Sequence, residues 1–213
     1  MTDNQALSLA LPKGRLFDQV IEFFAGRGLE FEFEERRLHA QDASGLVNII
    51  LVKNTDLPTY VNHGIAGLGI CGSDVVYESG LDFYRLMRFD FGGTRMCLAG
   101  KPGSFRLDSG RLTVATKFPR FTRDYFHERG VPVEIIKLNG SVELAPVLGL
   151  APCIVDLVET GSTLKAHDLA VIETLEEVTV SLIANPAYYK VHYQKIDSLL
   201  AILKGEESKP SGR

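Results

Sequence analysis

Residues 154–164 read Ile154-Val155-Asp156-Leu157-Val158-Glu159-Thr160-Gly161-Ser162-Thr163-Leu164. The stretch continues an apolar run, Cys153–Val158, that has the length and composition of a buried strand. A polar turn around Gly161 follows, and a short helix is expected after it. A buried strand that leads through a polar turn into a helix is the repeating unit of α/β proteins.

The same pattern extends along the chain in both directions from this stretch. Further apolar runs predict the strands Leu7–Leu11, Val47–Val52, Leu68–Cys71, Met96–Ala99, Leu112–Ala115 and Val133–Lys137. Helix-length segments such as Leu16–Ala25 and Thr122–Arg129 lie between several of them. Asp56 before Pro58, and Asn185 before Pro186, predict two helix starts, because their side chains can accept hydrogen bonds from orphan backbone amides. We therefore expect an α/β fold with mostly parallel strands.

Glycines interrupt this pattern near the middle of the chain. Phe91-Gly92-Gly93-Thr94 and the stretch Lys101–Gly110 are expected to break the regular elements, and a crossover between domains is expected nearby.

Composition excludes several classes of function. The formal net charge is -4 and the pI about 5.8, so no overall basic field attracts nucleic acid, and a phosphate ligand needs locally placed cations. The apolar run Ala6–Leu11 lacks the basic flank of a secretory signal, and no apolar stretch reaches the roughly 20 residues of a membrane span. We expect a cytoplasmic protein with no membrane partner. Cys71, Cys97 and Cys153 are expected to be reduced, buried thiols.

The turn after Asp156 has the residues of a sugar-phosphate site. Thr160, Ser162 and Thr163 offer hydroxyl groups around Gly161, which suits a phosphate that is held and not transferred. Asp156 and Glu159 suit sugar hydroxyls, because carboxylates accept hydrogen bonds from them. The alternative is an ordinary turn with a helix cap.

Two other segments are candidates for ligand contacts. Lys13, Gly14 and Arg15 follow the first predicted strand, where ligands collect in open α/β sheets, although they also suit a solvated turn. Gly72, Ser73 and Asp74 follow another strand and predict a pocket wall lined by backbone amides, without the glycine spacing of a dinucleotide site. Glu143 is either a ligand contact or a helix cap. Zinc and nucleophile-elbow signatures are absent from the sequence.

Together these segments resemble the ATP phosphoribosyltransferase family from about Leu7 to Lys190. The resemblance is carried by Leu11–Leu16, Asp56–Val61, Leu68–Asp74, Leu138–Pro146 and, most strongly, Ile154–Leu164. The sequence departs from the usual family pattern at four places. Gly67 stands where Asp is common, Lys53 where Arg is common, Ser162 where Arg is frequent, and Pro152-Cys153 where Asp and an aliphatic residue precede the signature strand.

The resemblance implies a two-lobed fold of the type II periplasmic-binding-protein kind, with the active site in the cleft between the lobes. The first lobe would comprise residues 1–92 and 180–213, and the second, residues 93–179, would carry the loop for phosphoribosyl pyrophosphate (PRPP). The chain length implies the short form of the family, which works with a regulatory subunit similar to histidyl-tRNA synthetase. A catalytic homodimer within a hetero-oligomer is expected.

The implied reaction condenses ATP with PRPP to give N1-(5-phosphoribosyl)-ATP and pyrophosphate, the first step of histidine biosynthesis, with Mg²⁺ carried by the pyrophosphate of PRPP. The expected PRPP contacts are Glu143, Asp156, Thr160, Gly161, Ser162 and Thr163. The expected ATP contacts are Lys13, Gly14, Lys53, Cys71, Gly72 and Asp74. The expected catalytic cations are Lys13, Arg15 and Arg36, the last reached across a dimer.

Two alternatives remain open from the residues alone. One is a cytosolic two-lobed protein that binds an anion or another solute without catalysis. The other is a phosphoribosyltransferase that acts on a different base. The hydroxyl-rich turn argues against the first alternative.

Overall fold

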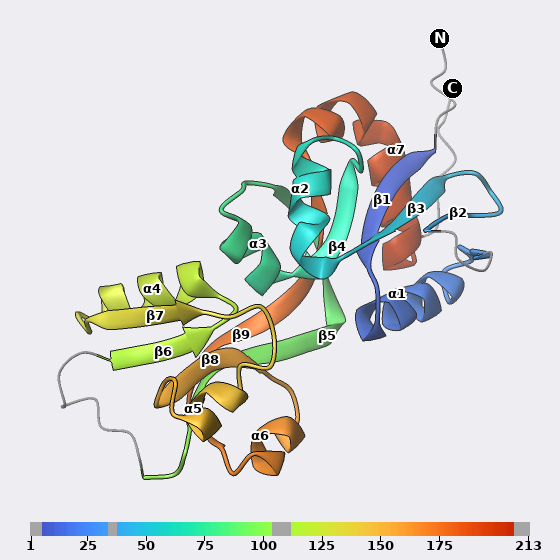
Figure 1. The fold of residues 1–213 in the computed structure, drawn as a ribbon. Helices are drawn as coiled ribbons and strands as arrows, with labels where there is room; N and C mark the ends of the chain where they lie inside the picture. Colours follow the sequence, from blue (N-terminus) through green and yellow to red (C-terminus); the bar gives the residue numbers. More distant parts are fainter. Residues whose placement is uncertain (1–5, 34–37, 104–111, 207–213) are drawn as a thin grey trace. The chain divides into compact units, whose positions relative to one another are not determined.

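The computed structural model describes residues 6–33, 38–103 and 112–206. By residue contacts the chain divides into two compact units, which we call the first unit (Met1–Gly92 with Thr179–Arg213) and the second unit (Gly93–Val178). The chain passes between them along two long strands, β5 (Tyr84–Gly100) and β9 (Ala170–Ala184) (Figure 1). The location of an active site in a cleft between two lobes stays a prediction.

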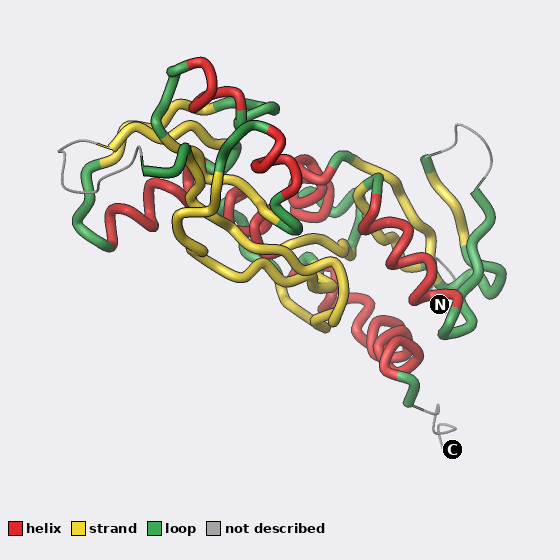
Figure 2. Tube along the Cα trace, turned by 90° about the horizontal axis from the view of Figure 1, so that it is seen from below, coloured by secondary structure: helices red, strands yellow, loops and turns green. Residues whose placement is uncertain are grey.

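Each unit combines helices with strands. The first unit contains β1 (Leu7–Pro12), α1 (Arg15–Ala25), β2 (His39–Gln41), β3 (Val47–Val52), a 3-10 turn (Asn54–Asp56), α2 (Leu57–Asn62), β4 (Leu68–Gly72), α3 (Ser73–Ser79) and α7 (Pro186–Lys204). The second contains β6 (Leu112–Thr116), α4 (Pro119–Glu128), β7 (Val133–Lys137), α5 (Leu144–Leu148), β8 (Cys153–Val158) and α6 (Ser162–Ala166). Figure 2 shows α7 as the long helix that leads to the C-terminal end of the chain.

The strands of the first unit follow the order β2-β3-β1-β4-β9. β1 is parallel to β3 and β4, and β9 is antiparallel to β4. Successive side chains of β1 point to opposite faces of the sheet. Leu9 packs in one core with Phe24 of α1 and Leu199 of α7, whereas Ala10 belongs to another core with Leu57 and Val61 of α2. Helices therefore cover both faces of this sheet.

The second unit repeats this plan, in the order β5-β8-β6-β7. β6 is parallel to β7 and β8, and β5 is antiparallel to β8. Val155 packs in one core with Phe126 of α4, and its neighbour Ile154 packs in another core with Leu164 of α6. A strand that is buried on both faces reads as a continuous apolar run, which explains the composition of β8.

The predicted α/β class is confirmed, but the strands are mixed and not mostly parallel, because β2 with β3, β4 with β9 and β5 with β8 pair antiparallel. The predicted helix start at Asn185 is confirmed. Its Oδ1 accepts hydrogen bonds from the backbone amides of Ala187 (2.9 Å) and Tyr188 (3.1 Å). Asp56 does precede α2, but its side chain makes no capping hydrogen bond, so that part of the prediction was wrong. All three cysteines are buried and free, as predicted.

The predicted break at Phe91–Thr94 was also wrong, because β5 runs through it without interruption. Gly92 has a φ of +70°, and a Cβ there would lie 2.8 Å from Cδ1 of Leu16. The positive φ and the close packing against α1 thus explain why residue 92 is a glycine. A glycine in such a place does not have to end a strand. Among the described residues, no helix is long and apolar enough to cross a membrane.

Candidate active site

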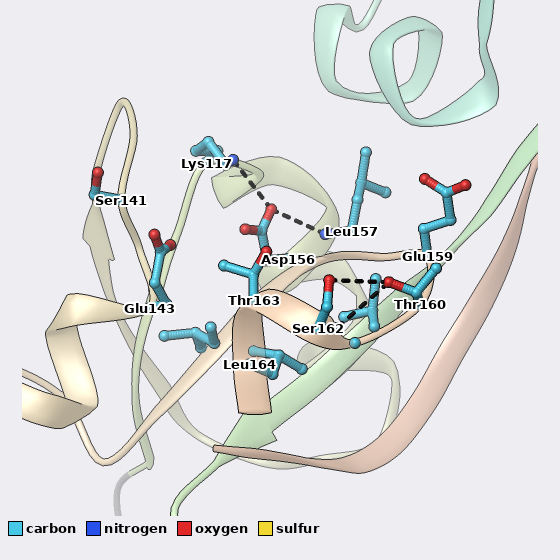
Figure 3. Close-up of a pocket in the computed structure, with 13 residues that line it drawn as sticks. Lys117, Ser141, Glu143, Asp156, Leu157, Glu159, Thr160, Ser162, Thr163 and Leu164 are labelled. Atoms are coloured by element: carbon cyan, nitrogen blue, oxygen red, sulfur yellow. Dashed lines mark hydrogen bonds and ion pairs between the residues drawn. The ribbon is translucent and has the colours of Figure 1, made fainter. Parts of the chain in front are cut away.

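A polar cavity of about 430 Å³ lies in the second unit, at the carboxyl ends of β6 and β8 (Figure 3). Ligands of open α/β sheets collect at this edge. The cavity is lined by Lys117, Ser141, Glu143, Ile154 and the stretch from Asp156 to Leu164. The predicted PRPP contacts Glu143, Asp156, Thr160, Gly161, Ser162 and Thr163 therefore all lie around one cavity.

The loop from Thr160 to Thr163 presents its hydroxyl groups at the surface of this cavity. Gly161 has a φ of +75°, which produces the sharp turn between β8 and α6. Thr160 Oγ1 lies 3.1 Å from Ser162 Oγ and accepts a hydrogen bond of 3.4 Å from the amide of Ser162. No side chain caps α6 at Gly161. The Thr160 hydroxyl does accept a hydrogen bond from the first amide of α6, so the alternative of an ordinary turn with a helix cap stays open.

Asp156 supplies a partly buried carboxylate to the same cavity. Its Oδ1 lies 3.3 Å from Nζ of Lys117 and accepts a hydrogen bond of 2.9 Å from the amide of Leu157. Burial raises the pKa of Asp156, the positive charge of Lys117 and the Leu157 amide oppose this rise, and the charge of Glu143 adds to it. The Asp156 carboxylate is therefore held between one cation and one other anion.

Glu143 lines the same cavity as Asp156, and both side chains are drawn in Figure 3. It is the residue before α5 and has helical backbone angles, but its side chain makes no capping hydrogen bond. The capping alternative for Glu143 is therefore not supported. Its half-buried carboxylate remains available for hydrogen bonds with a ligand.

In the first unit, Lys13 and Lys53 lie at the same edge of the sheet. β1 and β3 are parallel with Pro12 opposite Val52, so the lysines occupy matching positions just after the two strands. The amide of Lys13 donates a hydrogen bond of 3.3 Å to the carbonyl of Val52. Gly14 has a φ of +100° and turns the chain into α1, of which Arg15 is the first residue. Lys13, Arg15 and Lys53 are exposed.

The end of β4 belongs to this edge too, and its side chains are mostly buried. Burial raises the pKa of the Cys71 thiol to about 12, and the charge of Asp74 adds to the rise while that of Arg85 opposes it. Cys71 is therefore a protonated core residue and no nucleophile, and a contact with ATP would use its backbone. Asp74 is 8% exposed, and burial raises its pKa. Gly72 is also buried.

Lys117 is a residue of the cavity that the sequence did not predict, and Arg36, which it did predict, lies outside the described residues. Lys117 is the residue after β6 and precedes Phe118-Pro119, where α4 begins. The only sequence signal was a cation at the end of a predicted strand. That signal is weak, because most lysines after strands are simply solvated.

Comparison with known proteins identifies the family. The family model described as HisG, ATP phosphoribosyltransferase, matches residues 53–205, which is more than half of the chain. The chain belongs to the ATP phosphoribosyltransferase family. Its activity is ATP phosphoribosyl transfer, a pentosyl transfer that opens histidine biosynthesis. The resemblance of the sequence to this family is thereby confirmed.

Individual members of the ATP phosphoribosyltransferase family match over almost their full length. The curated enzyme of Thermoanaerobacter sp. (strain X514) is 43% identical over 201 residues, which cover 93% of this chain and 94% of that one. The enzyme of Clostridium acetobutylicum is 40% identical over 209 residues, covering 96% of this chain and 97% of that one. This coverage in both directions agrees with the short form of the family.

Solved structures give the fold. A chain from the ATP phosphoribosyl transferase (HisG:HisZ) complex of Thermotoga maritima matches with a TM-score of 0.82 and 36% identity, covering 94% of this chain and 98% of that one. A putative L-cystine ABC transporter protein from Listeria monocytogenes matches with a TM-score of 0.60 at 12% identity, covering 94% of this chain and 91% of that one, and this likeness concerns the fold alone. The predicted fold of the type II periplasmic-binding-protein kind is confirmed.

Proposed function

We propose that the cavity around Asp156 is the PRPP site of this ATP phosphoribosyltransferase. Thr160, Gly161, Ser162 and Thr163 would hold the 5-phosphate, and Asp156 and Glu143 would accept hydrogen bonds from the ribose hydroxyls. The observation that carries the proposal is that one cavity combines a hydroxyl-rich loop with two carboxylates. Uncharged donors suit a phosphate that stays attached to the sugar throughout the reaction.

In the proposed reaction, the lone pair of adenine N1 attacks the anomeric carbon of PRPP. The new N1–C1 bond forms as the bond from C1 to the pyrophosphate oxygen breaks, with inversion at C1. The transition state resembles an oxocarbenium ion, so the placement of charges and reactants contributes more than proton transfer. A strong general base is not required, because N1 attacks with a free lone pair.

The exposed cations of the first unit suit the phosphates of the two substrates. Lys13 and Lys53 follow neighbouring parallel strands, and Arg15 opens α1 after Gly14. Arginine offers a planar fork that matches phosphate oxygens, whereas lysine acts as a point charge. We assign Lys13 and Arg15 to the pyrophosphate or the ATP phosphates, and Lys53, Gly14, Cys71, Gly72 and Asp74 to the ATP site. Arg36 would act from a second copy of the chain.

A magnesium ion fits this arrangement as a companion of PRPP. Mg²⁺ keeps several waters and is commonly bound by substrate phosphates with few protein carboxylates. Within residues 6–33, 38–103 and 112–206, no group of three His, Cys, Asp or Glu residues is placed to hold a metal ion. We therefore assign the ion to the pyrophosphate of PRPP, where it would neutralise charge on the leaving group.

We also propose that the chain forms a homodimer and joins a regulatory subunit in a hetero-oligomer. The structural relative from Thermotoga maritima is part of a complex described as HisG:HisZ, which supports a partner of the HisZ kind. We expect this partner to resemble histidyl-tRNA synthetase. Mass measurement in solution, with and without a HisZ subunit, would test the assembly. A chain that stays monomeric in both samples would contradict it.

The activity is tested by incubating the chain with ATP, PRPP and Mg²⁺, with and without a HisZ subunit. We expect pyrophosphate release together with a change in the ultraviolet absorbance of adenine. PRPP binding without turnover in both samples would favour a solute-binding protein, and turnover with another base in place of ATP would favour a different phosphoribosyltransferase.

The site assignment needs its own test. In Thr163→Val, we expect the KM for PRPP to rise about tenfold, because one hydrogen bond to a charged phosphate is lost. Ser198→Ala is a matched control, because Ser198 is an exposed hydroxyl residue on α7 of the first unit. An unchanged KM in Thr163→Val would remove this residue from the phosphate site.

A further inference from the structure

Lys117 and Asp156 are brought together by the register of two strands. β6 and β8 are parallel, with Thr116 opposite Val155, so the next residue of each strand lies at the same level. Those residues are Lys117 and Asp156, and Nζ of Lys117 lies 3.3 Å from Oδ1 of Asp156 (Figure 3). The Lys117 side chain is 38% exposed and the Asp156 side chain 17%, so the pair stands at the wall of the cavity.

The backbone on both sides of Lys117 is fixed to β8 by Thr116. Thr116 is fully buried, and its hydroxyl donates a hydrogen bond of 2.6 Å to the carbonyl of Val155. The same hydroxyl accepts a hydrogen bond of 2.9 Å from the amide of Phe118. The residues before and after Lys117 are thus tied to the residue before Asp156. This arrangement fixes the backbone of Lys117 beside that of Asp156, so the ammonium group starts within reach of the carboxylate.

Burial and the charge of Glu143 act against the ionised form of Asp156. Glu143 and Glu159 line the same cavity, and the charge of Glu143 raises the pKa of Asp156 in addition to burial. Lys117 is the cationic residue among those that line the cavity in the described structure. Its charge and the amide of Leu157 favour the carboxylate form, and both contacts use Oδ1.

We propose that Lys117 is a positioning residue for PRPP, which keeps the Asp156 carboxylate ionised and oriented so that Oδ2 accepts hydrogen bonds from the ribose hydroxyls. The inference rests on the proposed assignment of Asp156 to the ribose. Lys117 acts through Asp156, so its contribution depends on the carboxylate being present. A lysine that contacted a phosphate directly would contribute whether or not residue 156 carried a charge.

A double-mutant cycle with Lys117→Met, Asp156→Asn and the double variant separates these cases. In full-length enzyme with any HisZ subunit it requires, we expect Lys117→Met to lower kcat/KM for PRPP about tenfold, as for the loss of a charge-assisted contact. In the Asp156→Asn background, Lys117→Met should have almost no further effect. Equal effects of Lys117→Met in both backgrounds would overturn the proposal.

The pH profile of kcat/KM for PRPP gives a second readout. Without the ammonium group, the pKa of Asp156 rises further, so the acidic limb of the profile should move to higher pH in Lys117→Met. Lys117→Arg should largely restore the wild-type limb, because it restores the positive charge. A limb that stays at the wild-type pH in Lys117→Met would also overturn the proposal.

Calorimetric measurement of ribose 5-phosphate binding tests the ribose contact of Asp156 separately from the positioning role of Lys117, and it needs no turnover. If Asp156→Asn binds ribose 5-phosphate and PRPP as well as wild type, the ribose assignment itself fails. If Asp156→Asn weakens binding and Lys117→Met adds its own full loss, only the role of Lys117 fails. Lys137→Met is the matched control, because Lys137 is an exposed lysine at the end of the adjacent β7 and does not line the cavity.

Discussion

The ring of Tyr188 occupies the space beside Gly67 that a side chain at this position would fill. A Cβ on Gly67 would lie 2.1 Å from Cδ1 of Tyr188, well inside van der Waals contact. The amide of Ser8 donates a hydrogen bond of 3.2 Å to the Tyr188 hydroxyl, and the amide of Gly67 donates one of 2.8 Å to the Ser8 hydroxyl. The position of the Tyr188 ring therefore explains why this chain has Gly67 where Asp is common in the family.

Gly67→Ala should lower the free energy of unfolding by about 2 kcal/mol, because the added methyl group forces the Tyr188 ring out of place. Combining it with Tyr188→Ala should cost less than the sum of the two single changes. Denaturant unfolding of the three variants measures this coupling. Gly140→Ala is the control, since a Cβ there meets no atom within 4 Å. Additive losses of stability would show that the Tyr188 ring is not the reason why position 67 requires glycine.

Gly161→Ala should weaken PRPP binding as well as stability. Gly161 has a φ of +75°, and the left-handed conformation costs a residue with a Cβ roughly 1 to 2 kcal/mol. Gly149→Ala meets the same penalty at a φ of +76°, at the end of α5 and outside the hydroxyl loop. We expect both variants to lose similar stability in thermal unfolding, with a raised KM for PRPP only in Gly161→Ala. Equal KM values for PRPP in the two variants would show that the backbone conformation at Gly161 does not affect PRPP binding.

Arg15→Ala should reduce turnover more than it reduces PRPP binding. A cation that stabilises charge developing on the pyrophosphate acts mainly in the transition state, and losing such a group costs about a hundredfold in kcat. Steady-state kinetics combined with direct measurement of PRPP binding would show the difference. Arg88→Ala, an exposed arginine of β5, serves as the control. Unchanged turnover would remove Arg15 from the leaving-group role.

Asp74→Asn should stabilise the fold at neutral pH and have a smaller effect in acid. Burial raises the pKa of Asp74 above its value in the unfolded chain, although the amide of Val75 opposes this. The folded state therefore binds this proton more tightly than the unfolded state. Its contribution to stability is fully present below the unfolded pKa and is lost as pH rises through the folded pKa.

The measurement is the difference in melting temperature between Asp74→Asn and wild type, taken at a series of pH values from acid to neutral. We expect the difference to grow from acid to neutral pH and then to level off. A difference that is the same at every pH would show that Asp74 titrates normally. The comparison of two proteins at each pH cancels the titration of groups common to both.

The sequence was sufficient for the short core strands and insufficient for the long ones. β1 and β8 read as continuous apolar runs, because helices cover them on both faces. Only Met96–Ala99 of β5 was predicted as a strand, and β9 was not predicted at all. The part of β9 from Ala170 to Glu177 is largely exposed, so it lacks both the apolar run and the alternation that indicate a strand.

The hydroxyl loop and Asp156 were predictable because they follow one another in the sequence. Lys117 was not, because its partner Asp156 lies on another strand, and only the pairing of Thr116 with Val155 makes them neighbours. A lysine after a strand has the same local appearance whether it faces water or a carboxylate. Contacts set by strand register are therefore the part of a site that a single sequence hides.

The division of the chain at Gly92 and Thr179 also sets the order in which the units can be completed during synthesis. The second unit is one continuous segment, so all its residues are synthesised before the last part of the first unit is made. The first unit needs β9 beside β4, and Leu199 and Leu203 of α7 in its core. Domains generally fold as units as the chain emerges. The hydroxyl loop can therefore form on the nascent chain before the sheet that carries Lys13 and Arg15 is closed.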